Sequence, residues 1–104
     1  MTDETPTGGR ALGDALEELY GVLEARKRDL PDGSYTAKLL SGPQDKLLKK
    51  IAEESGEVII AARDHDVAQT RYEVADLLYH LLVVMLREGV TPADLAVELQ
   101  SRRR

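Results

Sequence analysis

The sequence predicts an all-α fold of four to five helices, arranged as an antiparallel helix bundle that is completed by homodimerisation. Three observations support this prediction. The chain has 104 residues, which is enough for one domain with its own core. Its apolar content comes from Leu, Val, Ile and Ala without Phe or Trp, and these residues recur at helical spacing. Charged residues make up 32% of the chain, which suits solvated helix faces better than a sandwich of sheets.

The first residues of the chain, M-T-D-E-T-P-T-G-G-R, are polar and acidic. We expect residues 1–10 to be a disordered tail, because they lack the basic and apolar parts of a secretory signal. The all-α domain then spans residues 11–104. Its first helix is predicted over residues 13–26, and a turn at residues 30–33 ends it. We expect the following S-Y-T-A-K-L-L-S-G-P to be mostly a connector, with room for a short helical turn.

Two longer helices are predicted over residues 44–63 and 67–88. Gly42-Pro43 marks the start of the first, Asp64-His65-Asp66 separates the two, and Gly89 suits the left-handed position that follows a helix. The buried side of the helix at 44–63 is expected to hold seven apolar residues: Leu47, Leu48, Ile51, Ala52, Val58, Ile59 and Ala62.

The last helix begins at Thr91-Pro92, where Thr91 is an N-cap and proline occupies the first helical position. We expect Arg102, Arg103 and Arg104 to finish it. These arginines could form a nucleic-acid patch, but cations at a helix C-terminus are the favoured interpretation.

Apolar residues wrap nearly all the way round the helix at 67–88, and a helix that is apolar on all sides is buried on all sides. The residues concerned are Leu77, Leu78, Leu81, Leu82, Val83, Val84, Met85 and Leu86. Four short helices offer little material to surround it. We therefore expect a homodimer.

Composition excludes several functions. The net charge of −5 disfavours binding to nucleic acid and to anionic membrane surfaces. Cysteine is absent, which removes disulfides, thiolate nucleophiles and Cys-bound zinc, and suits a cytoplasmic protein. The most apolar run is about half the length that a membrane span needs.

The segment K-K-I-A-E-E-S-G-E-V-I-I-A-A, residues 49–62, places Glu53, Glu54 and Glu57 within about 100° of one another round a helix. Glu73 and Asp76 are three apart on the next helix, beside its apolar face. One such cluster is most often a solvated surface, but two on adjoining helices can converge at the core margin. Converging carboxylates need a cation, and Mg²⁺ prefers oxygen ligands that it shares with phosphates.

Lys46 and Lys50 lie on the same face as these acids, so they could hold phosphate oxygens or simply pair with glutamates along the helix. His80 follows Asp76 by one turn, but the spacing does not match the Glu-x-x-His of di-iron bundles. We expect His80 to be partly buried and hydrogen-bonded. Tyr35 and Tyr79 could stack on a base or pack within the protein, and packing is favoured for Tyr79.

Glu54-x-x-Glu57, then fifteen residues, then Glu73-x-x-Asp76 resembles the metal-binding signature of the all-α nucleoside triphosphate pyrophosphohydrolases, which include the MazG-type enzymes. Three blocks resemble one branch of them, the phosphoribosyl-ATP pyrophosphohydrolases of histidine biosynthesis. These blocks are S-Y-T-A-K-L-L-S-G (34–42), D-K-L-L-K-K-I-A-E-E-S-G-E-V-I-I-A-A (45–62) and E-V-A-D-L-L-Y-H-L-L-V (73–83). The resemblance covers roughly residues 12–100.

The resemblance implies Mg²⁺-dependent hydrolysis of phosphoribosyl-ATP to phosphoribosyl-AMP and pyrophosphate by a dimer. It places the metal ligands at Glu54, Glu57, Glu73 and Asp76, and leaves Glu53 or Glu54 to activate the attacking water. Tyr35, Lys38, Lys46 and Lys50 are then candidates for substrate binding. The length and the lack of cysteine favour a stand-alone enzyme over a fusion to the zinc-dependent enzyme of the next step.

Two alternatives remain open from the residues. A house-cleaning pyrophosphohydrolase of ordinary or deoxynucleoside triphosphates would share the fold and the metal site. A non-catalytic helical dimer that presents an acidic face to a partner would have no reason to bind Mg²⁺ through two helices.

Overall fold

The computed structural model describes residues 11–30 and 32–103. They form five α-helices: α1 (Leu12–Asp29), α2 (Tyr35–Ser41), α3 (Gln44–Arg63), α4 (Val67–Glu88) and α5 (Pro92–Ser101). The described residues contain no strand, so the predicted all-α class is confirmed. The predicted tail at residues 1–10 lies outside the described part of the chain.

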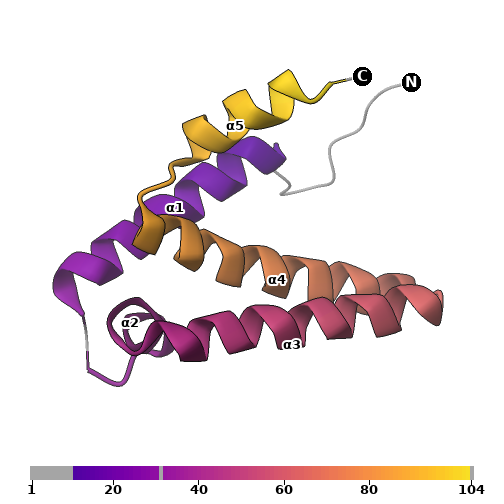
Figure 1. Ribbon diagram of the computed structural model, residues 1–104, viewed down its shortest axis with the longest axis horizontal. Helices are drawn as coiled ribbons and strands as arrows, with labels where there is room; N and C mark the ends of the chain where they lie inside the picture. The colour runs from indigo at the N-terminus through magenta and orange to yellow at the C-terminus, as the bar shows by residue number, and fades with distance from the viewer. Residues whose placement is uncertain (1–10, 31, 104) are drawn as a thin grey trace.

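The helices α3 and α4 form a long antiparallel hairpin, and their bounds agree with the predicted ones (Figure 1). Local chemistry explains this agreement. The Asp66 side chain accepts a hydrogen bond from the backbone N–H of Gln69, which caps α4 at its start. Gly89 ends α4 with a φ of 77°, in the left-handed region that glycine adopts without strain.

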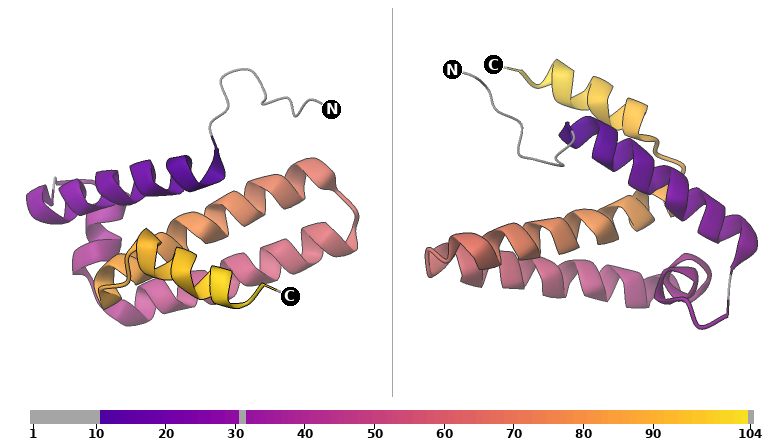
Figure 2. Two further views of the ribbon diagram at one scale, coloured as in Figure 1. Left: turned by 90° about the horizontal axis from the view of Figure 1, so that it is seen from above. Right: turned by 180° about the vertical axis from the view of Figure 1, so that it is seen from behind.

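The helices α1 and α5 lie on the same side of this hairpin (Figures 1 and 2). The hydroxyl of Tyr20 on α1 donates to the backbone oxygen of Val90, at 2.9 Å, and so ties α1 to the link between α4 and α5. Helix α5 begins with a capping box, in which the side chains of Thr91 and Asp94 bond to each other's backbone N–H groups.

The core lies at the end of the hairpin where α1 and α2 cover it. Its buried members come from the first four helices: Tyr20, Leu23, Leu39, Leu40, Leu47, Leu82, Val83 and Leu86. Leu23, Leu47 and Val83 are the most completely enclosed. Burying each such side chain stabilises the fold by about 1.5–3 kcal/mol relative to leaving it exposed.

The prediction that residues 34–43 are mostly a connector is wrong, because α2 occupies most of this segment. Its cap is local: the Ser34 hydroxyl accepts from the backbone N–H of Ala37, at 3.1 Å. Its remaining support is tertiary, since four of its seven residues are buried: Thr36, Ala37, Leu39 and Leu40. A helix this short shows no apolar period that the sequence could reveal.

Three further expectations need correction. Of the seven residues predicted on the buried side of α3, only Leu47 is fully buried, while Ala52, Ala62, Leu48 at 47% and Ile59 at 66% are exposed. Among the described helices, α3 packs only on α4 and α2, so one narrow stripe of apolar side chains is enough to cover these contacts. Arg102 and Arg103 do not finish α5, which ends at Ser101 with Arg102 as its C-cap, and Arg104 lies outside the described residues. The first helix is also longer than predicted, reaching Asp29.

None of the described helices combines the length and the apolar character that crossing a membrane requires.

Candidate metal centre and adjoining pocket

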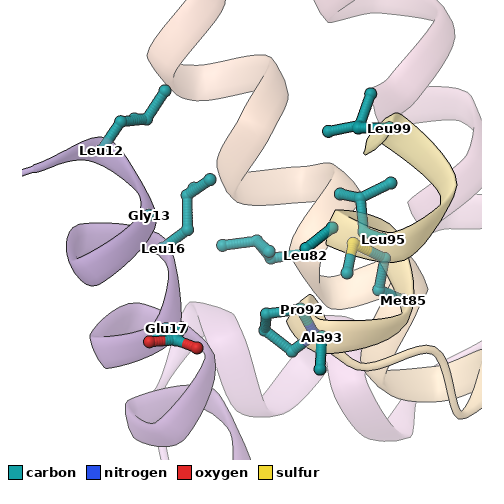
Figure 3. A pocket seen from close by; sticks show the side chains of 11 residues that line it. Leu12, Gly13, Leu16, Glu17, Leu82, Met85, Pro92, Ala93, Leu95 and Leu99 are labelled. Carbon is teal, nitrogen blue, oxygen red and sulfur yellow. The ribbon is translucent and has the colours of Figure 1, made fainter. Parts of the chain in front are cut away.

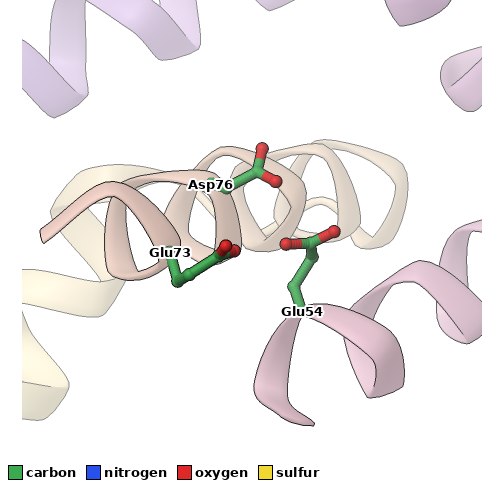
Figure 4. A group of neighbouring side chains, drawn as sticks. All are labelled: Glu54, Glu73 and Asp76. Carbon is green, nitrogen blue, oxygen red and sulfur yellow. The ribbon is translucent and has the colours of Figure 1, made fainter. Parts of the chain in front are cut away.

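Three carboxylates from two helices meet in the hairpin (Figure 4). Glu54 of α3 and Glu73 and Asp76 of α4 each offer an oxygen, and these oxygens all lie within 4.8 Å of one another. The spacing of three residues puts Glu73 and Asp76 on one face of α4, and the antiparallel pairing brings Glu54 opposite them. Glu54 and Glu73 are each only 7% exposed. The convergence at the core margin is therefore present for three of the four predicted ligands.

Neighbouring side chains hold two of these carboxylates. Lys50 Nζ lies 3.3 Å from Glu54 Oε2 and 3.7 Å from Glu53 Oε1. On α4, Gln69 Nε2 donates to Glu73 Oε2 at 2.7 Å. One lysine does not balance the crowded acids of both helices. The cluster has the hard oxygen donors and the excess negative charge that suit a divalent metal ion.

The pKa values of the acids reflect this crowding. Burial raises the pKa of Glu73, and the charges of Glu54 and Glu57 add to the effect, while the hydrogen bond from Gln69 opposes it. Burial and a hydrogen bond to Glu54 raise the pKa of Asp76. Burial also acts to raise the pKa of Glu54, but hydrogen bonds with Asp76 and Lys50 outweigh it and hold that pKa below its usual value. Of this coupled pair, Glu54 therefore gives up its proton more readily than Asp76.

The other two acids of α3 lie at the margin of the cluster. Glu57 is exposed and is not among the three converging ligands, although its charge is close enough to raise the pKa of Glu73. Glu53 is exposed and pairs with Lys50.

A pocket of about 410 Å³ between α2 and α3 adjoins the cluster. Its lining includes all four residues predicted to bind substrate: Tyr35, Lys38, Lys46 and Lys50. Lys49 and Glu53 line it as well. Four lysines facing one glutamate make a local basic site in a chain of net charge −5, which suits a polyanionic ligand such as a triphosphate. Lys49 is not among the residues predicted to bind substrate, because its place next to Lys50 in the sequence does not by itself indicate that it lines a pocket.

Lys50 joins the pocket to the carboxylates, because it lines the first and contacts Glu54 in the second. Burial acts to lower the pKa of Lys50, but its hydrogen bond to Glu54 and the neighbouring acids raise that pKa overall, so the ammonium stays charged. The two features therefore form one continuous site.

His80 is hydrogen-bonded as predicted, but it is buried more fully, with 2% of its surface exposed. Its Nδ1 lies 2.8 Å from the backbone oxygen of Asp76, and its Nε2 lies 2.8 Å from the hydroxyl of Tyr35. Tyr79 packs beside it and bonds to Thr36 on α2. No spacing rule relates Tyr35 to His80, since 45 residues separate them.

The all-α fold and the carboxylates on two antiparallel helices agree with the expectation for the pyrophosphohydrolase class whose signature the sequence resembles. Comparison with family models specifies the branch. The chain belongs to the phosphoribosyl-ATP pyrophosphohydrolase family, whose model matches residues 16–103. The predicted family is confirmed.

Individual relatives agree with this assignment. The chain is 48% identical over 90 residues to the phosphoribosyl-ATP pyrophosphatase of Pelotomaculum thermopropionicum, an alignment that covers 86% of this chain and 92% of the relative. It is 47% identical over 87 residues to that of Limosilactobacillus fermentum, covering 84% and 82%. It is also 45% identical over 102 residues to the histidine biosynthesis bifunctional protein HisIE of Deinococcus radiodurans. That alignment covers 98% of this chain and 46% of the relative, so the chain spans about half the length of such bifunctional proteins.

Proposed function

We propose that this chain is an enzyme that hydrolyses phosphoribosyl-ATP to phosphoribosyl-AMP and pyrophosphate, the second step of histidine biosynthesis. The family assignment and the names of the relatives support this reaction. The observation that carries it in the structure is the meeting of Glu54, Glu73 and Asp76 beside a pocket lined by lysines. A biosynthetic step of this kind takes place in the cytoplasm, where we locate the protein.

We propose Mg²⁺ as the cofactor, with Glu54, Glu73 and Asp76 as ligands and Glu57 as a fourth carboxylate within reach. The fit rests on the donor set, since all three converging groups are carboxylates and Glu54 and Glu73 are buried. When bound, Mg²⁺ withdraws charge from the phosphates and lowers the barrier to attack by water.

The side chains of this chain then have distinct tasks. Lys38, Lys46 and Lys50 bind oxygens of the triphosphate, and Tyr35 forms the wall of the pocket beside them. Glu53 or Glu54 orients the attacking water and accepts its proton. The water oxygen forms a bond to phosphorus as the anhydride bond between the α- and β-phosphates breaks, and pyrophosphate leaves. No covalent intermediate with the protein is involved.

A substrate panel tests this proposal directly. The purified protein is incubated with phosphoribosyl-ATP and with ordinary and deoxynucleoside triphosphates, each with and without Mg²⁺, and pyrophosphate release is measured. We expect release from phosphoribosyl-ATP only with Mg²⁺. Faster release from the ordinary triphosphates would indicate a house-cleaning enzyme, and no release from any of them would indicate a non-catalytic dimer.

We also propose that the protein works as a homodimer, as the wrapped apolar residues of α4 predict. Supporting this, the radius of gyration is 15.3 Å, whereas a compact chain of this length has about 13 Å. Large apolar side chains are exposed along α3, α4 and α5: Leu48, Ile59, Ile60, Val67, Tyr72, Val74, Leu95, Val97 and Leu99. Helix α5 contributes no buried residue.

An apolar pocket of about 280 Å³ adds to this uncovered surface (Figure 3). It lies between α1, α4 and α5, where Leu16, Leu82 and Leu95 line it. A second copy would give these surfaces a protein neighbour instead of water, which is a favourable change for apolar groups.

A further inference from the structure

Two consecutive residues of α2 are hydrogen-bonded to two consecutive residues of α4. Tyr35 Oη lies 2.8 Å from His80 Nε2, and Thr36 Oγ1 bonds to the hydroxyl of Tyr79. These pairs connect the two halves of the candidate site. Helix α2 supplies Tyr35 and Lys38 to the lysine pocket, whereas α4 supplies Glu73 and Asp76 to the carboxylate cluster.

The direction of the first bond follows from the surroundings of His80. Its Nδ1 lies 2.8 Å from the backbone oxygen of Asp76, and a carbonyl oxygen can only accept. Nδ1 therefore carries the proton of the neutral ring, which leaves Nε2 as an acceptor for the Tyr35 hydroxyl. The ring is 2% exposed, so both of its nitrogens depend on these protein partners.

Tyr35 needs such a partner to be held in one place. Half of its surface is exposed, and it stands at the first position of a helix of seven residues. Its ring meets that of His80 edge to face, at 5.9 Å and 78°. An exposed tyrosine without a hydrogen bond would sample several rotamers, and the wall of the pocket beside Lys50 would then vary with them.

We propose that His80 is a positioning residue that fixes the hydroxyl of Tyr35, and thereby holds the α2 wall of the lysine pocket in register with the carboxylates of α4. His80 does not line the pocket, and it is not one of the three converging ligands, although its Nδ1 lies 3.7 Å from Oδ1 of Asp76. It acts on the substrate through Tyr35. The consequence for substrate affinity rests on the proposed function, whereas the bond itself can be measured without any substrate.

Nitrogen NMR of the histidine rings tests the bond in the intact protein. The sequence has two histidines, and the other, His65, is exposed in the turn between α3 and α4, where it serves as an internal reference. At a pH of about 8, which is above the ordinary pKa of a histidine side chain, we expect His80 as the Nδ1–H tautomer. Tyr35→Phe should shift the Nε2 resonance of His80 and leave His65 unchanged. An Nε2–H tautomer would overturn the proposal. So would an Nε2 chemical shift of His80 that is the same in Tyr35→Phe as in the wild type.

Steady-state kinetics test the positioning role. Tyr35→Phe and His80→Leu should each raise KM for phosphoribosyl-ATP about fivefold, the equivalent of one hydrogen bond, without changing kcat or the Mg²⁺ concentration for half activation. The double variant should be no worse than either single one, because both remove the same bond. His80→Gln, which offers a side-chain oxygen near the place of Nε2, should restore KM. Tyr72→Phe, on an exposed part of α4, is the matched control.

Each contrary result has a distinct meaning. If the two single effects multiply in the double variant, Tyr35 binds the substrate directly and His80 does not position it, which rejects the proposal. If His80→Leu does not fold, Tyr35→Phe and His80→Gln still decide the outcome. If the wild-type protein does not hydrolyse phosphoribosyl-ATP, the proposed function fails and the NMR measurement alone decides about the bond.

Discussion

Glu54 is the residue that connects all parts of the candidate site. It is buried on α3, it converges with Glu73 and Asp76 of α4, and it lies 3.3 Å from the pocket residue Lys50. Its hydrogen bonds hold its pKa below the usual value despite burial, so it carries a negative charge among other acids. The ionised carboxylate is the form that can act as a ligand of a cation.

We predict that Glu54→Gln lowers the turnover of phosphoribosyl-ATP by on the order of 100-fold or more, since the loss of a ligand should cost at least as much as the loss of a residue that supports one. The melting temperature without Mg²⁺ should stay the same or rise, because one of the crowded charges is removed. Glu24→Gln, at an exposed acid of α1, is the control. Near-wild-type turnover of Glu54→Gln would mean that the converging carboxylates are not the catalytic centre.

Tyr20 provides a second test at the scale of single residues. It is buried, and its hydroxyl donates to the backbone oxygen of Val90 at 2.9 Å. We predict that Tyr20→Phe lowers the free energy of unfolding by about 0.5–1.5 kcal/mol at neutral pH, measured by urea denaturation. A stability equal to the wild type would show that this bond does not hold α1.

Tyr20→Phe should also change how the free energy of unfolding depends on pH in the alkaline range. Burial, followed by the charges of Glu24 and Asp94, raises the pKa of Tyr20 above 10.0. The folded state then binds the phenol proton more tightly than the unfolded chain. The resulting stability is fully present below pH 10.0 and is lost as the pH rises through the raised pKa. Tyr20→Phe should therefore lose less stability than the wild type in this range.

At the scale of elements, α2 is the helix whose position depends most on its neighbours. Arg87 of α4 donates from Nη1 to the backbone oxygens of Leu39, at 2.7 Å, and Gly42, at 2.9 Å. These bonds hold the C-terminal end of α2, as Tyr79 and His80 hold its start. Helix α4 thus controls where the α2 wall of the lysine pocket lies.

We predict that Arg87→Ala costs about 1.5–3 kcal/mol of stability, because two carbonyl oxygens lose a charged donor. It should also raise KM, since α2 carries Tyr35 and Lys38. The matched control is Arg63→Ala on α3. Its exposed side chain pairs with the exposed Asp64, and the substitution should cost no more than about 0.5 kcal/mol. Equal losses of stability for the two variants would contradict this role of Arg87.

Two glycines give a second comparison between elements. A Cβ at Gly42, the residue after α2, would lie 2.6 Å from the backbone oxygen of Lys38, whereas a Cβ at Gly56 within α3 would meet nothing within 4 Å. We predict that Gly42→Ala destabilises the protein by about 1–3 kcal/mol, and that Gly56→Ala stabilises it by about 0.5–1 kcal/mol through helix propensity. Thermal melts of both variants check this. Destabilisation by Gly56→Ala would indicate that another backbone approaches α3 there.

At the scale of the whole molecule, the described helices leave much apolar surface uncovered. We predict a homodimer of twice the 11.5 kDa chain mass by light scattering at micromolar concentration. Ile59→Glu, on an exposed apolar position of α3, should shift the protein toward the monomer while the helix content stays the same. Val22→Glu, on an exposed position of α1, is the control and should retain the dimer mass. A monomeric mass for the wild type would refute the prediction.

Much of the fold follows from local sequence. The bounds of α3 and α4 are predictable because Gly42-Pro43, Asp66 and Gly89 mark the ends of long apolar periods. The metal-site candidates follow likewise, since residues three apart share a helix face wherever that helix packs. The position of α2 does not follow, because the burial of Leu39 and Leu40 and the bonds from Arg87 come from a helix about 45 residues away.

By itself, the sequence determined the all-α class, the two long helices, the family and the acids that form the cluster. The family follows from the resemblance of three sequence blocks, whereas the helices and the faces that carry the acids depend on spacing within a few turns of one helix, which the order of residues sets directly. Only the tertiary structure decided which acids meet, which lysines share a pocket, and that Tyr35 bonds to His80. The physical reason is that these contacts depend on how helices dock, and docking is decided by the packing of buried side chains over the whole chain rather than by any local pattern.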